Sequence, residues 1–261
     1  MSECRWCGGT TRVGDGPVVR PEWMRWRCNG CGVFGYVHDP SSDELSQVYE
    51  SAWQDSERSG TYAAGSTDEK IARSLLDAVN FSPLGSKCLD YGGGKGSFAK
   101  VLIEKGCERL AVFEPFGQNP GLQFVNWVND LNALGEEKFD WIFMVEVLEH
   151  LLNPQETLAE IRRHLAPGGK LVITTPNALG WRARIDGFKW REAQNPTHIN
   201  LFTAQILKDC LMKAGYSNAK RILRPVTYKA KGLKSLGLAM TQIIGVDGGL
   251  RFIATNTSTG K

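Results

Sequence analysis

The sequence lacks any long hydrophobic run, because no apolar stretch approaches the roughly 18 residues that a membrane-spanning helix needs. We therefore expect no insertion into a membrane. The N-terminus lacks a basic stretch followed by an apolar one, so it does not resemble a signal peptide and we expect a cytoplasmic protein. Apolar residues still make up 42% of the 261 residues, which excludes a largely disordered chain. The length is typical of one large domain with a small appendage.

The net charge of +3 hides an uneven distribution along the chain. Residues 1–157 contain 14 Lys and Arg against 23 Asp and Glu, whereas residues 158–261 contain 17 against 5. A basic second part can attract an acidic partner by long-range steering. The same excess is consistent with an ordinary solvated surface, so both interpretations stay open.

Four of the seven cysteines form two Cys-x2-Cys pairs, each followed directly by glycine: Cys4, Cys7, Cys28 and Cys31. Two residues between thiolates let both sulfurs reach one metal ion, and glycine permits the backbone to turn toward them. Two such turns complete the four-thiolate set of a zinc site, which has no open position and is therefore structural. Iron in place of zinc is the alternative, while disulfides are disfavoured in a cytoplasmic protein.

Patterning divides the chain into three parts. Residues 1–38 form the predicted zinc ribbon, residues 39–68 a linker with a short helix, and residues 69–261 a larger domain. Within the linker, residues 39–45 predict a turn and a capped helix start, whereas the polar residues 50–68 indicate a mobile connection. The larger domain alternates helices with apolar strands, which predicts an α/β fold with a doubly wound, mostly parallel sheet.

A glycine-rich turn follows the first strand of this domain, where ligands of such sheets bind. It reads DYGGGKG over residues 90–96. It is not a Walker A loop, because Gly96 and not Ser or Thr follows Lys95. Asp90 would repel a pyrophosphate but suits a cationic amino group, and Glu114 after the next strand suits two ribose hydroxyls. The chemistry predicts an aminoacyl nucleoside without phosphate as ligand.

This turn resembles the D-x-G-x-G-x-G motif of class I S-adenosylmethionine-dependent methyltransferases. Glu114 stands at the family's ribose-binding position, residues 139–150 resemble its fourth-strand motif, and residues 165–169 resemble its turn before the fifth strand. The resemblance covers about residues 85–220. It implies a seven-stranded Rossmann-like sheet and S-adenosylmethionine as the cofactor.

The resemblance also implies which residues contact the cofactor. The acidic residue that usually follows the third strand is poorly placed here, and Asp130, beside Leu131, is the candidate for contacting the adenine amine. The full predicted set is Asp90, Tyr91, Gly92, Gly94, Gly96, Glu114, Asp130, Leu131 and Val145.

The N-terminal part of the sequence has a less specific resemblance. The cysteine pairs, PSSDEL over residues 40–45 and YES over residues 49–51 are similar to bacterial methyltransferases often found among polysaccharide and secondary-metabolite enzymes. This implies a role in polysaccharide biosynthesis and an acidic or sugar-containing small molecule, or a glycan, as acceptor.

Methyl transfer to a hydroxyl requires removal of its proton. Glu146, Glu149 and His150 have a spacing that puts them on one face of a helical turn, and His198 follows the fifth strand. These four candidate catalytic residues resemble the divalent-metal sites of ubiquinone-biosynthesis O-methyltransferases and small-RNA 2′-O-methyltransferases, which implies Mg²⁺ or a similar ion here. In metal-free members of the class, Glu146 caps the turn and His150 packs locally or acts as base. Both interpretations stay open.

The leading functional interpretation is therefore an S-adenosylmethionine-dependent O-methyltransferase, as a monomer or homodimer. Residues 179–194 contain Trp, Arg and Lys, which suit a sugar, a base or a phosphate. The alternative is a ribose 2′-O-methyltransferase of RNA that uses the zinc ribbon and the basic second part. A third interpretation is a non-catalytic adaptor that has kept the fold.

Overall fold

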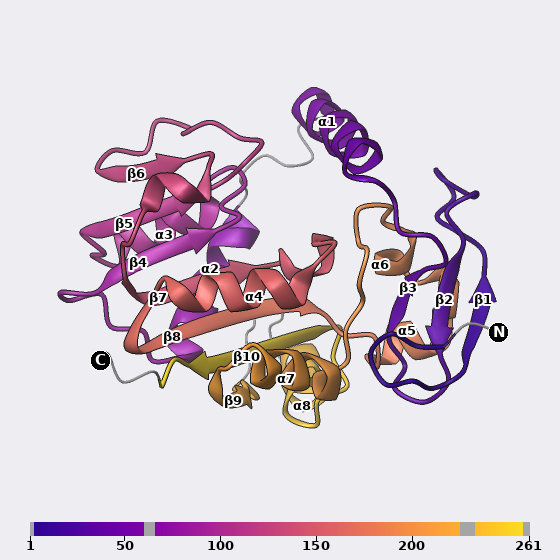
Figure 1. The fold of residues 1–261 in the computed structure, drawn as a ribbon. Coiled ribbons are helices and arrows are strands. Elements are labelled where there is room, and N and C mark those ends of the chain that lie inside the picture. The colour runs from indigo at the N-terminus through magenta and orange to yellow at the C-terminus, as the bar shows by residue number, and fades with distance from the viewer. Residues whose placement is uncertain (1–2, 60–65, 225–232, 258–261) are drawn as a thin grey trace.

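The structure is a computed structural model that describes residues 3–59, 66–224 and 233–257. The larger of its two sheets has seven strands in the order β6-β5-β4-β7-β8-β10-β9 (Figure 1). Their bounds are β4 (Lys87–Tyr91), β5 (Arg109–Phe113), β6 (Val125–Val128), β7 (Phe139–Val145), β8 (Leu165–Pro176), β9 (Ser217–Arg221) and β10 (Gly249–Thr255). Strands β4 to β8 run parallel, and β10 is antiparallel to both neighbours. The predicted α/β fold with a mostly parallel, Rossmann-like sheet is confirmed.

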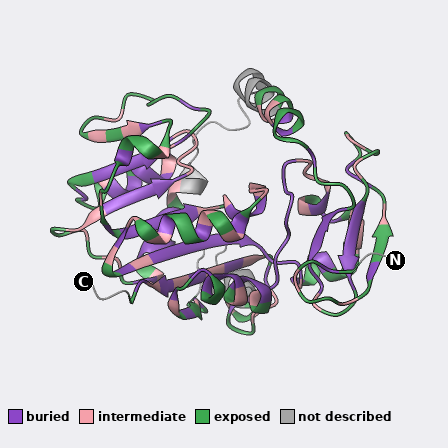
Figure 2. Ribbon diagram, viewed as in Figure 1, coloured by how far each residue is buried: buried purple, intermediate pink, exposed green. Residues whose placement is uncertain are grey.

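Helices cover both faces of this sheet, as the alternation of elements predicts. Five helices belong to this layer structure: α2 (Ser66–Ala78), α3 (Ser97–Glu104), α4 (Pro154–Arg163), α7 (Ala204–Lys213) and α8 (Leu233–Ile243). Leu75 of α2 and Leu102 of α3 join one buried core, while Leu158 of α4 and Leu207 of α7 join the other. Figure 2 shows the strands between these helices as a largely buried layer. Within the described ranges, no helix has the length and apolarity to cross a membrane.

A separate three-stranded antiparallel sheet lies at the N-terminal end of the chain (Figure 1). It consists of β1 (Thr11–Gly14), β2 (Arg25–Cys28) and β3 (Phe34–Tyr36), with β2 in the centre. We call residues 3–38 the Cys module.

The chain after β8 packs on the Cys module and not on the large sheet. This segment contains α5 (Trp181–Asp186), the 3-10 turn η3 (Gly187–Lys189) and α6 (Arg191–Gln194). Phe34 of β3 contacts the rings of Phe188 and Trp190, with centroids 5.7 and 6.2 Å apart. Phe34 and Leu201 also form an isolated antiparallel bridge. The first and the last third of the chain thus share one small hydrophobic core.

The linker differs from its prediction, because α1 runs from Ser42 to Ser59. Its start follows the predicted pattern: the Ser41 hydroxyl accepts a hydrogen bond from the Glu44 N–H, and the Glu44 carboxylate accepts one from the Ser41 N–H. The expectation of a short helix and a mobile connection from residue 50 is wrong for residues 50–59. They contain neither glycine nor proline, so nothing ends the helix before Gly60.

Candidate active site

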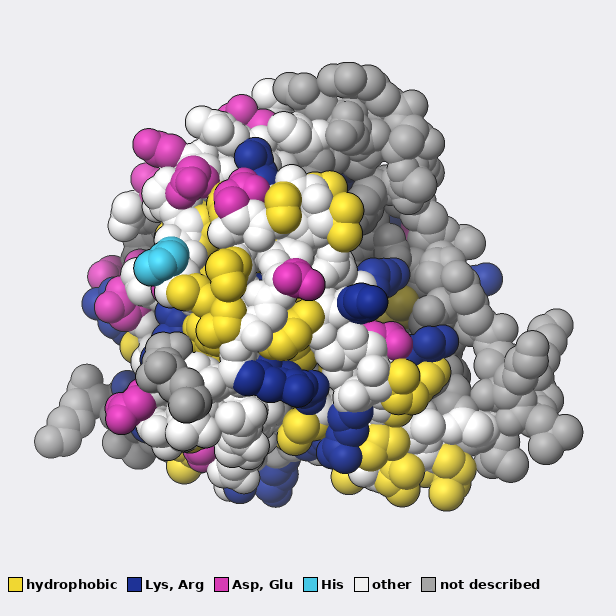
Figure 3. All heavy atoms as spheres, turned by 90° about the vertical axis from the view of Figure 1, so that its right-hand side faces the viewer, with side chains coloured by type: hydrophobic (Ala, Val, Ile, Leu, Met, Phe, Trp, Pro, Cys, Tyr) yellow, Lys and Arg dark blue, Asp and Glu magenta, His cyan; other side chains and the backbone are white. Residues whose placement is uncertain are grey.

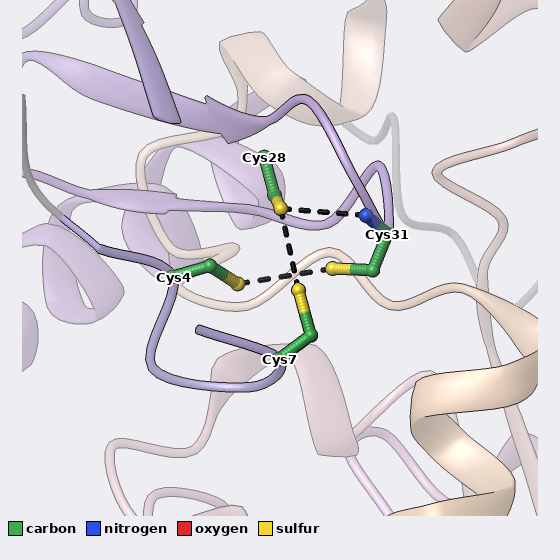
Figure 4. A group of neighbouring side chains, drawn as sticks. All are labelled: Cys4, Cys7, Cys28 and Cys31. Atoms are coloured by element: carbon green, nitrogen blue, oxygen red, sulfur yellow. Dashed lines mark hydrogen bonds between the residues drawn. The ribbon is translucent and has the colours of Figure 1, made fainter. Parts of the chain in front are cut away.

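The four predicted zinc ligands converge on one point from two turns of the Cys module (Figure 4): Cys4, Cys7, Cys28 and Cys31. The Sγ atoms of Cys4 and Cys31 are 3.7 Å apart, and those of Cys7 and Cys28 are 3.5 Å apart. Thiolates that each lie about 2.3 Å from one zinc ion in a tetrahedron are about 3.8 Å from one another. The glycines that follow the two pairs have φ values of 71° and 81°, as turns toward a shared ion require. The geometry fits a four-thiolate metal site.

A cavity of about 1470 Å³ opens at the carboxyl ends of the parallel strands. The turns after β4, β5 and β7 form its walls together with α1 and the chain before Leu201. Nine of the predicted site residues line it: Tyr91, Gly92, Gly94, Glu114, Val145, Glu146, Glu149, His150 and His198. Four others do not: Asp90, Gly96, Asp130 and Leu131. The location agrees with the general rule for ligands of open α/β sheets.

The glycine loop after β4 has a backbone that other residues rarely adopt. Gly92 and Gly94 have φ values of 79° and 54°. A Cβ on Gly92 would lie 2.5 Å from Cγ2 of Val147, whereas a Cβ on Gly94 would meet no atom within 4 Å. The Gly94 N–H donates to Oε2 of Glu114 at 2.8 Å, and the Phe116 N–H donates to Oε1 at 3.0 Å. Glu114 therefore fastens the glycine loop to the end of β5 at the cavity wall.

Asp90 lies beneath this loop. Its side chain is 1% exposed, and its Oδ2 has no hydrogen-bond partner. Burial, together with the nearby charge of Glu114, raises the pKa of Asp90 to about 7. A cationic group above the loop would favour the ionised carboxylate, as the sequence analysis expects.

Asp130 and Leu131 lie outside the lining of the cavity. Asp130 is exposed and begins the 3-10 turn η1 (Leu131–Leu134), where its Oδ1 accepts a hydrogen bond from the Asn132 N–H at 2.9 Å. Leu131 packs against the hydrophobic core. The carboxylate is used locally as a cap, which is the commonest role of Asp at a helix start. An adenine contact from either residue stays a prediction.

At the other end of the cavity, Glu149, His150 and His198 come together. One ligand-type atom from each lies within 4.8 Å of the other two. The two imidazole rings contact edge to face, with centroids 4.7 Å apart. Oε2 of Glu149 accepts a hydrogen bond from the Thr175 hydroxyl at 2.9 Å. Oε1 of Glu149 is buried without a hydrogen-bond partner and lies 3.9 Å from Nε2 of His150.

Glu146 is placed differently from its prediction. The three residues do not share a helical face, because Glu146 has a φ of 55° and precedes the 3-10 turn η2 (Leu148–His150). Its Oε1 accepts a hydrogen bond from the Thr174 hydroxyl at 2.7 Å. Glu146 lines the cavity but is not one of the residues whose ligand atoms lie within 4.8 Å of one another. The Glu146 carboxyl nevertheless lies near that of Glu149, whose pKa its charge raises.

Burial sets the protonation of this group. It raises the pKa of the Glu149 carboxyl well above its usual range, and the charge of Glu146 adds to the effect. Burial also lowers the pKa of His150 to about 4 and that of His198 well below its usual range. Both imidazoles are therefore neutral at pH 7, and the Glu149 carboxyl binds a proton more readily than an exposed one.

Three residues that the sequence did not point to contact the imidazoles: Glu192, Asn195 and Thr197. Nδ1 of His150 lies 3.0 Å from the carbonyl oxygen of Thr197, so Nδ1 carries the proton in the neutral ring and Nε2 keeps its lone pair. Nδ2 of Asn195 lies 3.0 Å from Nε2 of His198, and Nδ1 of His198 lies 3.5 Å from Oε2 of Glu192. Polar residues clustered around His198 were the only signal in the sequence, and such clusters are common in loops.

The chain was also compared with known proteins. A family model described as a methyltransferase domain matches residues 63–220, which include the glycine loop, Glu114 and the Glu149 group. The bifunctional biotin biosynthesis protein of Cellvibrio japonicus is 26% identical over 205 residues, which cover 70% of this chain and 40% of that protein. The ubiquinone biosynthesis O-methyltransferase of Cereibacter sphaeroides is 27% identical over 164 residues, which cover 55% of this chain and 66% of that protein. The chain thus spans from two fifths to just under two thirds of the length of these two relatives.

A solved structure has a similar fold. The Burkholderia thailandensis 1,6-didemethyltoxoflavin-N1-methyltransferase, which was solved with 1,6-didemethyltoxoflavin and S-adenosylhomocysteine bound, superposes with a TM-score of 0.56. The identity is 18%, and the match covers 87% of this chain and 96% of that one. At this identity the likeness concerns the fold alone.

Proposed function

The chain belongs to the methyltransferase domain family and is an S-adenosylmethionine-dependent methyltransferase, and from this premise we propose that it methylates a hydroxyl oxygen of a small-molecule, sugar or glycan acceptor. One observation carries the proposal: the glycine loop and the Glu149, His150 and His198 group open into the same cavity. Transfer to a hydroxyl needs an in-line approach to the methyl group and a group that takes the hydroxyl proton. Both requirements can be met within this one cavity.

The cofactor end has a defined set of candidate contacts. S-adenosylmethionine supplies a methyl group that is activated by the positive charge on its sulfur. We assign the ribose hydroxyls to Glu114, because both of its carboxylate oxygens are already oriented by backbone N–H groups at the cavity wall. The loop at Gly92 and Gly94 provides backbone without Cβ atoms for close approach. Asp90 beneath the loop favours the cationic amino group.

At the acceptor end, His150 is the candidate base. Its Nδ1 is occupied by the Thr197 carbonyl, so Nε2 keeps a lone pair that can accept a proton. Burial keeps the ring neutral at pH 7, as a base requires. His198, whose ring contacts His150, is the second candidate, but Nδ2 of Asn195 would first have to give up its hydrogen bond to the Nε2 lone pair.

The same residues fit a divalent cation. The buried Oε1 of Glu149 has no hydrogen-bond partner, and it lies 3.9 Å from Nε2 of His150, too far for a hydrogen bond. Metal ligands of this kind lie about 2.0–2.2 Å from the ion, so there is room for one between these atoms. As the alternative to a base at His150, we propose that Glu149, His150 and His198 would hold it, with Nε2 of His150 as a ligand. One carboxylate and two imidazoles favour Mn²⁺, Fe²⁺ or Zn²⁺ over the Mg²⁺ that the sequence suggested. Such an ion lowers the pKa of a bound hydroxyl.

We also propose that the cysteine cluster holds a structural zinc ion. The sulfur separations of 3.5 and 3.7 Å support this, because they match those of a four-thiolate zinc site. With no fifth ligand position, the ion stabilises the Cys module and takes no part in methyl transfer.

A cationic group at the cavity wall supports an acidic acceptor. Arg221 and Arg251 both pair with the buried Asp247, at 3.4 and 2.8 Å. Burial raises the pKa of the nearby Glu146 carboxyl, and the charge of Arg251 acts to lower it. Asp247 and Arg251 line the cavity. Arg251 is the candidate contact for a carboxylate or phosphate on the acceptor.

The proposal is tested first by calorimetric titration of metal-replete protein with S-adenosylhomocysteine. We expect one site with micromolar affinity, about −8 kcal/mol. The loaded protein is then screened with radiolabelled S-adenosylmethionine against nucleotide sugars, glycans, acidic small molecules and mixed RNA. Label on an acceptor oxygen supports the proposal. Label on carbon or nitrogen contradicts it, and label on RNA alone favours the second candidate.

The second candidate is ribose 2′-O-methylation of RNA. It is favoured by exposed arginines beside aromatic rings on and near the Cys module: Arg182 lies 4.2 Å from the Trp181 ring centre, and Arg12 lies 5.7 Å from that of Phe188. Figure 3 shows several Lys and Arg side chains among hydrophobic ones on the side of the molecule where this module lies. Such pairs can stack on bases. Binding to mixed RNA that weakens steeply as salt rises would support this candidate.

A further inference from the structure

Arg25, the first residue of β2, is a buried cation without an anionic partner. Its side chain is 0% exposed, and no Asp or Glu of the described ranges forms an ion pair with it. Its Nε and Nη1 have no hydrogen-bond partner. Burying a charge without a counter-ion destabilises a fold, so stability alone does not account for an arginine here.

The guanidinium group contacts the backbone that carries His198. Its Nη2 donates to the carbonyl oxygens of Asn195 and His198, at 2.9 and 2.8 Å, and contacts the Tyr36 hydroxyl at 2.7 Å. The Tyr36 hydroxyl in turn donates to the carbonyl oxygen of Pro196 at 2.9 Å. The guanidinium carbon lies 3.9 Å from the centre of the Tyr36 ring. Two side chains of the Cys module thus bind three carbonyl groups within four residues.

The same segment is fixed from the opposite direction by the turn that carries the other two active-site groups. The N–H groups of Ile199 and Asn200 both donate to the carbonyl oxygen of Glu149, at 2.7 and 3.0 Å. The carbonyl oxygen of Thr197 lies 3.0 Å from Nδ1 of His150. Residues 195–200 therefore lie between the Cys module and the Glu149 turn, with hydrogen bonds to each.

We propose that Arg25, supported by Tyr36, is a positioning residue that holds residues 195–198 so that His198 faces Glu149 and His150. The proposal rests on the function proposed above, because it gives His198 its place in the site. It also gives the Cys module a role in the reaction: β2 runs directly from Arg25 to the cluster ligand Cys28. Strand β2 thus links the cysteine cluster covalently to Arg25. Arg25 in turn is hydrogen-bonded to the backbone that carries His198.

The chain offers a matched control in Arg27. It lies on the same face of β2, is also buried, and donates to the carbonyl oxygens of Ala178 and Ala183, both at 3.3 Å. Those carbonyls belong to residues before the His198 segment. Arg27→Met therefore removes a buried arginine and two carbonyl contacts without touching residues 195–198. Arg25→Met also removes a buried arginine and two carbonyl contacts, but these contacts are with Asn195 and His198.

The experiment compares the two variants in the full-length, zinc-replete protein. Hydrogen exchange is measured at the amides of residues 199–201, Mn²⁺ binding by electron paramagnetic resonance, and S-adenosylhomocysteine binding by calorimetry. We expect Arg25→Met to speed exchange and weaken Mn²⁺ binding, each by about tenfold or more, because it removes charged hydrogen bonds. Arg27→Met should change neither, and both variants should bind S-adenosylhomocysteine within about twofold of the parent, a shift well under 1 kcal/mol.

Equal effects of the two variants, or none from Arg25→Met, would overturn the proposal. Faster exchange in Arg25→Met with no Mn²⁺ bound by the parent would support the positioning role and reject the divalent-metal site. If Arg25→Met does not fold, Tyr36→Phe takes its place, because it deletes only the hydroxyl bonded to Arg25 and Pro196. It should speed exchange at residues 199–201, and unchanged exchange there would overturn the proposal. Arg25→Lys keeps the charge and should restore part of the protection.

Discussion

The two ends of the cavity are built in different ways. The cofactor end is nearly contiguous in sequence: residues 90–96 form one turn, and Glu114 closes it from the neighbouring strand. The reacting end is assembled from three distant segments, since η2, the chain around His198 and the Cys module meet only in the folded state. We therefore expect most substitutions at one end to change binding or catalysis there and to leave the other end unchanged.

The largest effect is expected at the reacting end. His150→Ala and His198→Ala should each lower the rate of methyl transfer by about 10²- to 10⁴-fold, because each removes an acid–base or metal-binding group. Neither should change the affinity for S-adenosylhomocysteine. Activity is measured with the acceptor found by screening, and His164→Ala, at the end of α4, is the control with no expected effect. Full activity in His150→Ala would disprove its assignment as base.

The next effect is expected at the cofactor end. Asp90→Asn keeps the shape of the side chain but removes the charge that we assign to the cationic amino group of the cofactor. We expect S-adenosylhomocysteine to bind about 10- to 100-fold more weakly, the value of a charged hydrogen bond. Mn²⁺ binding to the same protein should be unchanged. Loss of Mn²⁺ binding in this variant would show that the two ends are not separate.

One substitution should break the separation. Gly92 lies in the cofactor loop, yet a Cβ there would lie 2.5 Å from Val147, in the turn that leads to Glu149. Gly92→Ala also forces a residue with a Cβ into a φ of 79°, at about 1–2 kcal/mol. We expect a lower melting temperature and losses at both ends. Gly94→Ala is the matched control, because its φ is also positive but a Cβ there meets no atom within 4 Å. If both variants behave alike, the contact with Val147 has no effect.

The smallest effect is on pH dependence. The pKa of Asp90 in the free protein is about 7, and the cofactor needs the ionised form. Calorimetry should show affinity for S-adenosylhomocysteine falling below pH 7 by up to about tenfold per pH unit. The free protein has the opposite dependence: this folded-state pKa lies above the ordinary 3.8, so the stability from protonated Asp90 is present at low pH and is lost as pH rises through about 7. Asp90→Asn should flatten both profiles.

The same contrast explains what the sequence predicts and what it does not. The glycine loop and the cysteine pairs are local, because residues a few positions apart share one turn, and both lie where their patterns predict. Asp130 has a role that its residue type does not determine. An acidic residue suits both an adenine amine and a helix cap, and here the side chain caps η1.

Other features leave no local pattern at all. Arg25 contacts residues 170 and 173 positions further along the chain, and an arginine in a short polar strand looks like a surface residue. The position of Glu146 depends on a backbone φ of 55°, which spacing cannot reveal. Helix α1 is longer than the sequence predicts. Its polar composition suggested a connecting segment, although it contains no residue that breaks a helix.

The pairing of Phe34 with Leu201 has a consequence for how the chain folds during synthesis. The Cys module leaves the ribosome before residue 201, but the backbone hydrogen bonds of Phe34 are completed by that later residue. Until then, β3 is an open sheet edge with an aromatic side chain exposed, which is a hazard for pairing with another chain. Early metal capture would hold the module folded through this interval. Productive folding of these two segments would therefore depend on metal binding to the Cys module before residue 201 is made.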